Sequence, residues 1–364
     1  MQFISEIPFK EIEKNKLKLN SVMKGNNKII VTAEWPGKLA VSQESALDDA
    51  DAQFAVILEN CNNKFIAVKH GFDNIPCANL DFGGVAWLMS LAYGCALIRI
   101  GGRINSKPLY SSIEEAAKMK EITRIYEHGL YPVITERILK FQEMYPEIPI
   151  TIPDNQSPID VLTCILHSEA AMYAMFDDGE AVHSIMDIIT NSIIEVNRYY
   201  EKTIKNFGGF RAGTWQSIGM HLADDNAAFL SPSVYQEYAI PYVNRIVNEF
   251  GNVNFHCCMG YAQNLENMAL IKGFTGYDAH PDFNPQDRII SAIKSNRASW
   301  EVFNFPWSRK DDREYPDIEM FKKAINASEN KCSMIITVYD GDKDTALKMA
   351  DEVKNYVVLK GRDA

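Results

Sequence analysis

The chain has 364 residues, of which 46% are apolar and 23% charged, a composition typical of a globular protein with a sizeable core. Its formal net charge is -11 and its pI about 5.2, which argues against binding to nucleic acid or to anionic membrane surfaces. The seven cysteines are odd in number and scattered, so they indicate reduced thiols in a cytoplasmic protein rather than a disulfide framework.

The first residues carry neither a basic segment nor an apolar stretch, so we expect no signal peptide. No apolar run reaches the roughly 18 residues of a membrane span, so no membrane association is expected. Residues 1–28 are polar and rich in lysine, and they predict an amphipathic helical cap that precedes the main fold.

From residue 28 onward, short strand-like apolar runs alternate with helical patterns. The expected strands are 28–33, 65–69, 96–100, 148–152, 218–223, 253–257, 275–279, 300–304 and 334–339. The expected helices are 112–121, 132–144, 180–205, 233–250, 263–272, 285–295, 318–327 and 343–356. This alternation predicts a mostly parallel sheet with helices outside it.

About eight strand–helix units favour an α/β fold of the (β/α)8 TIM-barrel type over an open sheet. No Gly-x-Gly-x-x-Gly follows a strand, which argues against a dinucleotide-binding fold. We therefore expect one domain over 1–364, with residues 1–28 as a helical N-terminal extension and 206–213 as a loop over the barrel mouth.

Catalytic groups of such barrels collect where the strands end. Side chains that can take part in catalysis or metal binding lie at the ends of most of the expected strands. They are Glu34, Lys69, His70, Asp154, Asn155, Asp224, Asp225, His256, Cys258, Asp278, His280, Asn304, Tyr339 and Asp340. Since loops of any protein are rich in such residues, this pattern alone identifies no chemistry.

His256 and Cys258 form the most informative pair. Side chains alternate along a strand, so these two share one face and Cys257 points the other way. Imidazole and thiolate together are donors for a thiophilic metal such as zinc. The alternative is a pair that holds no metal.

Several segments, taken in their order, resemble the uroporphyrinogen decarboxylase superfamily from about residue 50 to the C-terminus. They are residues 65–69, 91–95, Glu169 in a helix rich in Ala and Met, 176–183, Ala223-Asp224-Asp225 leading into 230–241, and His256-x-Cys258. The resemblance implies a (β/α)8 barrel. It also implies either a metal-free decarboxylase of porphyrin biosynthesis or a zinc-dependent methyltransferase that works with a corrinoid protein.

The decarboxylase branch carries an arginine-rich motif after its first strand, but this chain has Glu34 there and no arginine. An octacarboxylate substrate needs a strongly cationic pocket, for which only Lys69, Arg99, Arg103 and Arg211 are candidates. The departure favours the methyltransferase branch, and a carboxy-lyase acting on a tetrapyrrole or smaller carboxylate stays as the alternative enzyme.

In the methyltransferase branch, His256 and Cys258 match two zinc ligands. The branch has a third cysteine after its last strand, where this chain has none. Cys332 lies at the start of that strand. At 3.3 Å per residue, roughly 20 Å separates it from the strand's C-terminal end, where the third ligand is expected. Glu34, His280 or Asp340 are therefore the candidates for a third ligand.

The resemblance predicts Zn²⁺ held by His256, Cys258 and His280, with Asp224 and Asp225 orienting a ligand histidine or contacting the acceptor. Glu34 and His70 complete the set of candidate catalytic residues. The partners would be a corrinoid protein carrying methylcobalamin and a small-molecule methyl acceptor, since the chain has no Asp-x-His-x-x-Gly motif for a corrinoid of its own. A barrel that binds a corrinoid or tetrapyrrole without catalysis is the third reading, and whether the chain forms a homodimer stays open.

Overall fold

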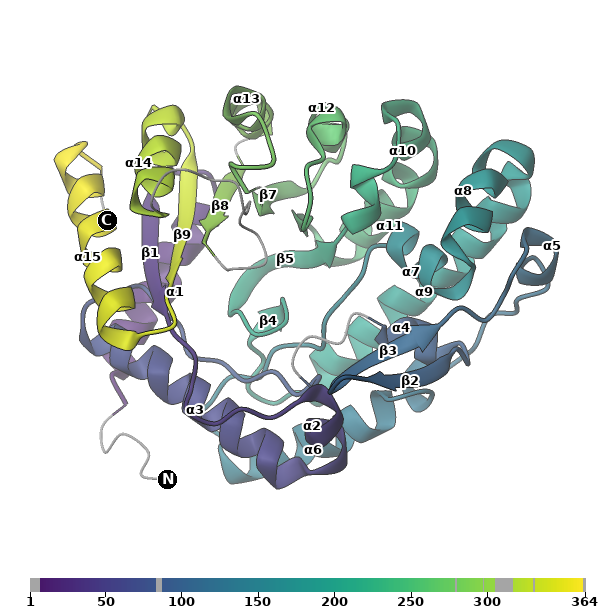
Figure 1. Cartoon of the computed structure of the whole chain (residues 1–364), viewed down its shortest axis with the longest axis horizontal. Helices are drawn as coiled ribbons and strands as arrows, with labels where there is room; N and C mark the ends of the chain where they lie inside the picture. The colour runs from purple at the N-terminus through teal and green to yellow at the C-terminus, as the bar shows by residue number, and fades with distance from the viewer. Residues whose placement is uncertain are drawn as a thin grey trace.

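Seven parallel strands form one curled sheet at the centre of the computed structural model, with helices along its outer side (Figure 1). The structure describes residues 7–82, 87–278, 280–296, 298–304, 317–329 and 331–362. The strand order is β1-β9-β8-β7-β6-β5-β4. The strands are β1 Ile29–Glu34, β4 Gly209–Phe210, β5 Gln216–Ala223, β6 Val253–His256, β7 Phe274–Asp278, β8 Ser299–Phe303 and β9 Ser333–Tyr339.

Two short extended segments lie between β1 and β4 and continue the wall of the barrel. Parallel bridges join Ala78 to Ile150 and Ile150 to Phe207. On the β1 side, the Asp73 amide donates to the Val31 carbonyl at 3.0 Å. The strands and these segments together form a barrel-like ring, which confirms the predicted fold class.

The sheet is buried on both faces, as parallel sheets usually are. All five residues of β8 are buried, and so are the first three residues of β1. The longer helices are α3 Ala50–Lys69, α6 Tyr131–Met144, α7 Pro158–Ile165, α8 Ser168–Asp177, α9 Gly179–Thr203, α11 Ile240–Phe250, α13 Gln286–Asn296, α14 Asp317–Ser328 and α15 Lys343–Leu359. In α9, buried apolar residues recur every three or four positions from Val182 to Val196, so one helix face packs on the core.

The expected N-terminal cap is present as α1, Phe9–Met23, and residues 1–6 of the predicted extension lie outside the described residues. Asn15 Nδ2 donates to the carbonyls of Phe72 and Asn74 at 3.0 and 3.1 Å. Lys18 pairs with Asp73 at 2.9 Å. These contacts anchor α1 to the segment that follows α3, next to β1.

Two predicted barrel strands are wrong. Residues 65–69 form the last turns of α3, whose buried Phe54, Leu58, Cys61 and Phe65 follow helical spacing. A short apolar run cannot by itself distinguish a buried helix turn from a strand. The wall position expected for this run belongs to the segment around Ala78.

Residues 96–100 do form a strand, but it is not part of the barrel. It is β2, Ala96–Ile100, which pairs antiparallel with β3, Arg103–Lys107. The turn between them has positive φ at Gly101 (58°) and Gly102 (84°), the conformation that favours a tight two-residue hairpin. The hairpin lies beside α4, Leu88–Ala92, away from the seven-stranded sheet (Figure 1).

Smaller differences concern the extent of elements. Residues 148–152 contribute two isolated bridges, both at Ile150, rather than a full strand. The predicted helix 112–121 is reduced to α5, Ile113–Ala116, and helix 233–250 divides into α10, Pro232–Tyr238, and α11. Residues 263–272 hold a 3-10 turn, Ala262–Asn264, and the short α12, Leu265–Met268. Within the described ranges, no helix has both the length and the apolarity needed to cross a membrane.

Candidate metal centre

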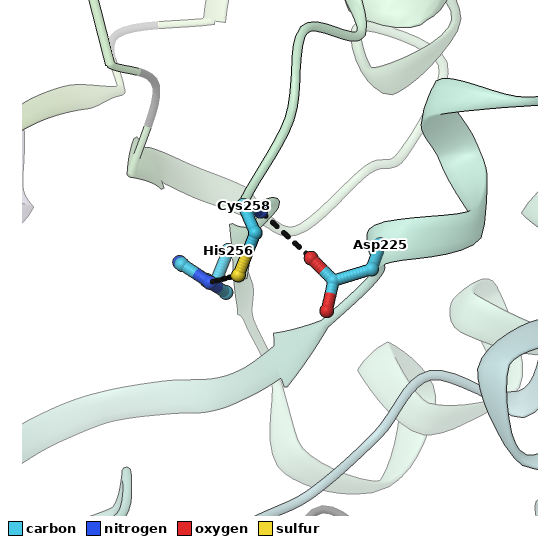
Figure 2. A group of neighbouring side chains, drawn as sticks. All are labelled: Asp225, His256 and Cys258. Carbon is cyan, nitrogen blue, oxygen red and sulfur yellow. Dashed lines mark hydrogen bonds between the residues drawn. The ribbon is translucent and has the colours of Figure 1, made fainter. Parts of the chain in front are cut away.

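Asp225, His256 and Cys258 come together at the carboxyl ends of β5 and β6 (Figure 2). Their potential ligand atoms all lie within 4.8 Å of one another. The strand register explains this proximity, because Ala223 at the end of β5 pairs with His256 at the end of β6. Asp225 then begins a 3-10 turn, Asp225–Ala228, and Cys258 lies two residues beyond β6.

The three residues are already in contact. His256 Nε2 lies 2.9 Å from Cys258 Sγ, and the Cys258 amide donates to Asp225 Oδ1 at 2.7 Å. Cys258 is exposed, whereas the other two are partly buried. The sulfur therefore faces solvent at the barrel mouth, where an incoming molecule can reach it.

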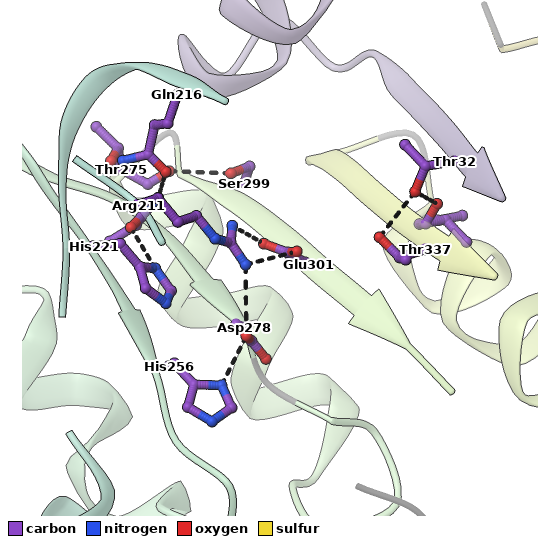
Figure 3. A network of polar contacts seen from close by, with 12 residues as sticks. Thr32, Arg211, Gln216, His221, His256, Thr275, Asp278, Ser299, Glu301 and Thr337 are labelled. Atoms are coloured by element: carbon purple, nitrogen blue, oxygen red, sulfur yellow. Dashed lines mark hydrogen bonds and ion pairs between the residues drawn. The ribbon is translucent and has the colours of Figure 1, made fainter. Parts of the chain in front are cut away.

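The second nitrogen of His256 is held by Asp278. Nδ1 lies 2.8 Å from Asp278 Oδ2, and the two residues are register partners on β6 and β7 (Figure 3). Burial lowers the pKa of His256, but Asp278 and Cys258 more than offset this and hold that pKa well above its usual value. A carboxylate behind a histidine fixes the ring and leaves its other nitrogen directed at the site.

Asp278 in turn belongs to a buried charged network inside the barrel (Figure 3). Arg211 Nη2 lies 3.8 Å from Asp278 Oδ2, and both guanidinium ends bond Glu301, at 2.5 and 2.9 Å. Arg211 is thus engaged by two carboxylates and is not available as a cation for substrate. Arg211 comes from the 206–213 segment, which reaches the barrel interior rather than only covering its mouth.

Asp224 and Asp225 are neighbours in sequence with different surroundings. Asp224 is fully buried and accepts from Ser157 Oγ and Tyr235 Oη, both at 2.6 Å. Burial raises the pKa of Asp224 to about 6. We expected Asp224 or Asp225 to orient the histidine, but Asp278 makes that contact because β7, not β5, presents an acid toward Nδ1.

Asp160 on α7 fixes the turn that carries Asp225. Its carboxylate accepts from the backbone amides of Asp225 and Asn226 at 2.8 and 2.9 Å. Burial, together with Asp224 and Asp225, raises the pKa of Asp160 well above its usual value. Its position within a helix gave no sequence signal, whereas Asp278 was among the acids expected at strand ends.

The other predicted site residues lie elsewhere. Glu34 ends β1 as expected, 3.7 Å from Lys64 Nζ. His70 is the exposed C-cap of α3 rather than a strand-end residue, because residues 65–69 are helical. His280 is buried against Phe303, with Nδ1 at 3.2 Å from the Asp282 amide, and it is not part of the three-residue group.

Cys332 precedes the first residue of β9, so it lies at the opposite end of that strand from Tyr339. It is buried, and burial raises the pKa of its thiol to about 11. Asp340 follows Tyr339 at the correct end, where its amide donates to the Glu34 carbonyl. Among the described residues, the group that can hold a metal takes its carboxylate from Asp225.

Asp154 is a partly buried acid that interacts electrostatically with His256 and Asp225. Asp154 has its amide bonded to Asp81 Oδ2 at 2.8 Å. Burial and the Asp81 charge raise the pKa of Asp154 to about 6, against the opposing effect of His256. On the side of Asp225, a cavity of about 290 Å³ lies between α7 and the β2–β3 hairpin, with Trp87, Asn105 and Asp160 in its lining.

Imidazole, thiolate and carboxylate together suit zinc, and three protein ligands leave a fourth position for a small molecule. This donor set comes from side chains whose ligand atoms already converge, so the residues present fit the metal. The cavity beside Asp225 offers room for a small molecule near this group.

Comparison with known proteins supports the resemblance seen in the sequence. The family model described as uroporphyrinogen decarboxylase (URO-D) matches residues 89–294. A solved structure described as a methyltransferase from Methanosarcina mazei superposes with a TM-score of 0.69 at 15% identity, covering 94% of this chain and 98% of that one. At this identity the likeness shows the fold alone.

A malate synthase from Haloferax volcanii matches at a TM-score of only 0.30 and 7% identity, over 68% of this chain and 72% of that one, and supports no inference. A search of curated proteins gave no match.

Proposed function

This chain belongs to the uroporphyrinogen decarboxylase family, and we propose that it is a methyltransferase that moves a methyl group between a corrinoid protein and a small acceptor such as a thiol. The observation that carries the proposal is the convergence of Asp225, His256 and Cys258 at the barrel mouth. The structural neighbour described as a methyltransferase agrees with it. Zinc would be held by these three side chains, with Asp225 in the place expected for His280.

A free thiol has a pKa near 8.5 and is mostly protonated at neutral pH. Zinc, when bound, would favour the deprotonated form of an acceptor thiol at the fourth position. In the transfer, the methyl group would form a C–S bond with the acceptor, and the partner's corrinoid would keep the electron pair of the cleaved Co–C bond. The thiol proton goes to a base, for which Asp154 is the candidate because its pKa of about 6 leaves it ionised at neutral pH.

The protein's own residues hold the centre in place. Asp278 fixes the ring of His256 through Nδ1, so Nε2 stays directed at Cys258 Sγ. Asp160 holds the backbone turn of Asp225, and Asp225 receives the Cys258 amide. These contacts reduce the rearrangement needed on metal binding. The corrinoid would come on a separate protein that covers the mouth.

The electrostatics argue against a decarboxylase that grips several carboxylates. Arg211 is engaged by Glu301 and Asp278. Arg99 is paired with Asp48 at the surface, and Arg103 lies in the same hairpin, outside the barrel. Lys69 ends α3 rather than a barrel strand. None of the four candidate cations therefore lies at a strand end of the barrel with its charge available.

The test is the zinc content of the purified protein, measured by plasma mass spectrometry for the wild type and single variants. We expect one zinc per chain in the wild type and loss of it in Cys258→Ala and Asp225→Asn. Cys257→Ala is the matched control, because Cys257 is buried with Sγ 3.9 Å from the Asp225 carbonyl and takes no part in the metal group. His280→Ala tests the alternative third ligand and should keep its zinc.

Activity is then followed as loss of the methylcobalamin absorbance with a panel of thiols. Zinc-loaded wild type and Cys257→Ala should transfer the methyl group, whereas Cys258→Ala should not. A wild-type protein that takes up no zinc even when it is supplied would refute the proposal and favour a metal-free lyase or a binding protein.

A further inference from the structure

A second cleft lies along α3, apart from the candidate metal centre. It has a volume of about 370 Å³ and extends from Gln53 to Lys64 on one face of the helix. The ten residue steps from Gln53 to Asn63 span about 15 Å at 1.5 Å per residue. Trp35, Ile57 and Phe82 contribute apolar wall, so the cleft is elongated, with polar groups at both ends.

Gln53 presents an unused donor in this cleft. The residue is 4% exposed, and within the described part of the chain its Nε2 has no hydrogen-bond partner. Its orientation is fixed, because Oε1 lies 2.6 Å from Arg137 Nη1 and a guanidinium can only donate. The NH2 group therefore cannot be exchanged with the oxygen. Leaving such a buried donor unpaired costs about 1–3 kcal/mol.

Arg137 places a positive charge directly behind this amide. The residue is 6% exposed, its guanidinium donates to the carbonyls of Ala46 and Leu47, and it stacks on Phe82 with its Cζ 4.9 Å from the ring centroid. No carboxylate among the described residues forms an ion pair with it. The nearby Asp48 pairs with Arg99, and Asp49 caps α3. A buried cation of this kind is stabilised by an anion placed close to it.

The far end of the cleft, at Lys64, differs from the Gln53 end in its charge balance. Lys64 donates to the Gly213 carbonyl at 2.9 Å and lies 3.7 Å from Glu34, so its charge is already balanced. Asn63 adds a buried Nδ2 without a partner among the described residues. The cation without an ion pair among the described residues is therefore Arg137, at the Gln53 end.

We propose that this cleft binds a small organic carboxylate, with its carboxylate on Gln53 Nε2 in front of Arg137 and its apolar body along α3 toward Glu34. The donor supplies the hydrogen bond, the cation supplies the charge, and the apolar walls take the chain. The cleft takes no lining residue from Asp225, His256 and Cys258, so its ligand binding can be measured on the metal-free protein.

Binding of hexanoate to the metal-free protein, measured by calorimetry or saturation-transfer NMR, tests the proposal. Hexylamine and hexanol have the same chain and serve as ligand controls. We expect hexanoate to bind about tenfold more tightly than either, the effect of one charge-assisted hydrogen bond. Longer linear carboxylates should bind more tightly than butanoate, because the cleft continues beyond Gln53.

Gln53→Glu is the informative variant. A carboxylate at this position still accepts from Arg137, so the packing is kept, but the donor becomes an anion. Hexanoate affinity should fall by about tenfold or more. The exposed Gln236 on α10 provides the matched control, since Gln236→Glu makes the same chemical change away from the cleft and should leave binding unchanged.

Val56→Trp gives a second test if Gln53→Glu folds poorly. Val56 lines the cleft and is partly exposed, so a larger side chain fills the space without disturbing the core. Hexanoate binding should be lost while the melting temperature is kept. Equal affinities for hexanoate and hexylamine, or full binding in a folded Gln53→Glu or Val56→Trp protein, would overturn the proposal.

Discussion

Replacing Asp154 by Asn should stabilise the metal-free protein at neutral pH. Burial and Asp81 raise the pKa of Asp154 from 3.8 to about 6. A carboxyl whose pKa is raised on folding favours the folded state below the unfolded pKa, and this contribution is lost as pH rises through the folded pKa. Asn is neutral at every pH, so the variant does not lose this stability as the pH rises.

The pKa values set the size of the effect. A change from 3.8 to about 6 corresponds to about 3 kcal/mol in the free energy of unfolding. Because Asp154 is still partly exposed, this value is an upper limit. The difference between Asp154→Asn and wild type should be near zero at about pH 4 and grow to about 2–3 kcal/mol by about pH 7.

Urea denaturation of both proteins across this pH range measures the difference. Asp351→Asn, an exposed residue in α15, controls for the loss of one acid from the surface. A difference for Asp154→Asn that stays constant with pH would refute the reasoning, because no proton would then be linked to folding at this position. Under the proposed function, the more stable variant should also transfer methyl groups more slowly.

Three further outcomes are expected. Asp278→Asn should weaken zinc binding by about 10- to 100-fold in equilibrium dialysis, because the ring of His256 loses its carboxylate partner; unchanged affinity would mean that Asp278 does not orient the ligand. Tyr235→Phe should lower the free energy of unfolding by about 1–3 kcal/mol, since the buried Asp224 loses a donor, while the exposed Tyr173→Phe should have no effect. Gly209→Ala should destabilise by about 1–3 kcal/mol or more in urea denaturation, because φ is +112° and a Cβ would meet the Gln216 carbonyl, whereas Gly94→Ala, with open space around it, should lose less.

The sequence predicts most of the barrel because its longer strands are buried on both faces. Continuous apolar runs mark β1 and β5 to β9 within a few residues of their observed bounds. The second wall position could not be found in this way, and the third, expected at 148–152, is reduced to the bridges at Ile150. The segments at Ala78 and Ile150 pair through single bridges and have no long apolar run, while the buried turn at 65–69 resembles a strand in composition.

The candidate site is likewise predicted only in part from the sequence. The period of two along a strand places His256 and Cys258 on the same side, and the structure brings their side chains into contact. The partners of this pair depend on register between strands, which spacing in the sequence does not contain. Asp225 reaches the group because Ala223 pairs with His256, and Asp278 reaches Nδ1 because His256 pairs with Asp278.

The wall between β1 and β4 is joined by few backbone bonds, so it is the place where the ring can open most readily. Among the described residues, its backbone bonds join Asp73 to Val31, Ala78 to residues 149–151, and residues 150–152 to 206–209. The side chains of Asp73 and Asn74 add bonds to β1. Cys77 lies in this wall and is 6% exposed. Cys77 also lines the cleft along α3, so its thiol should react slowly with a labelling reagent, and opening of this wall should increase the labelling rate.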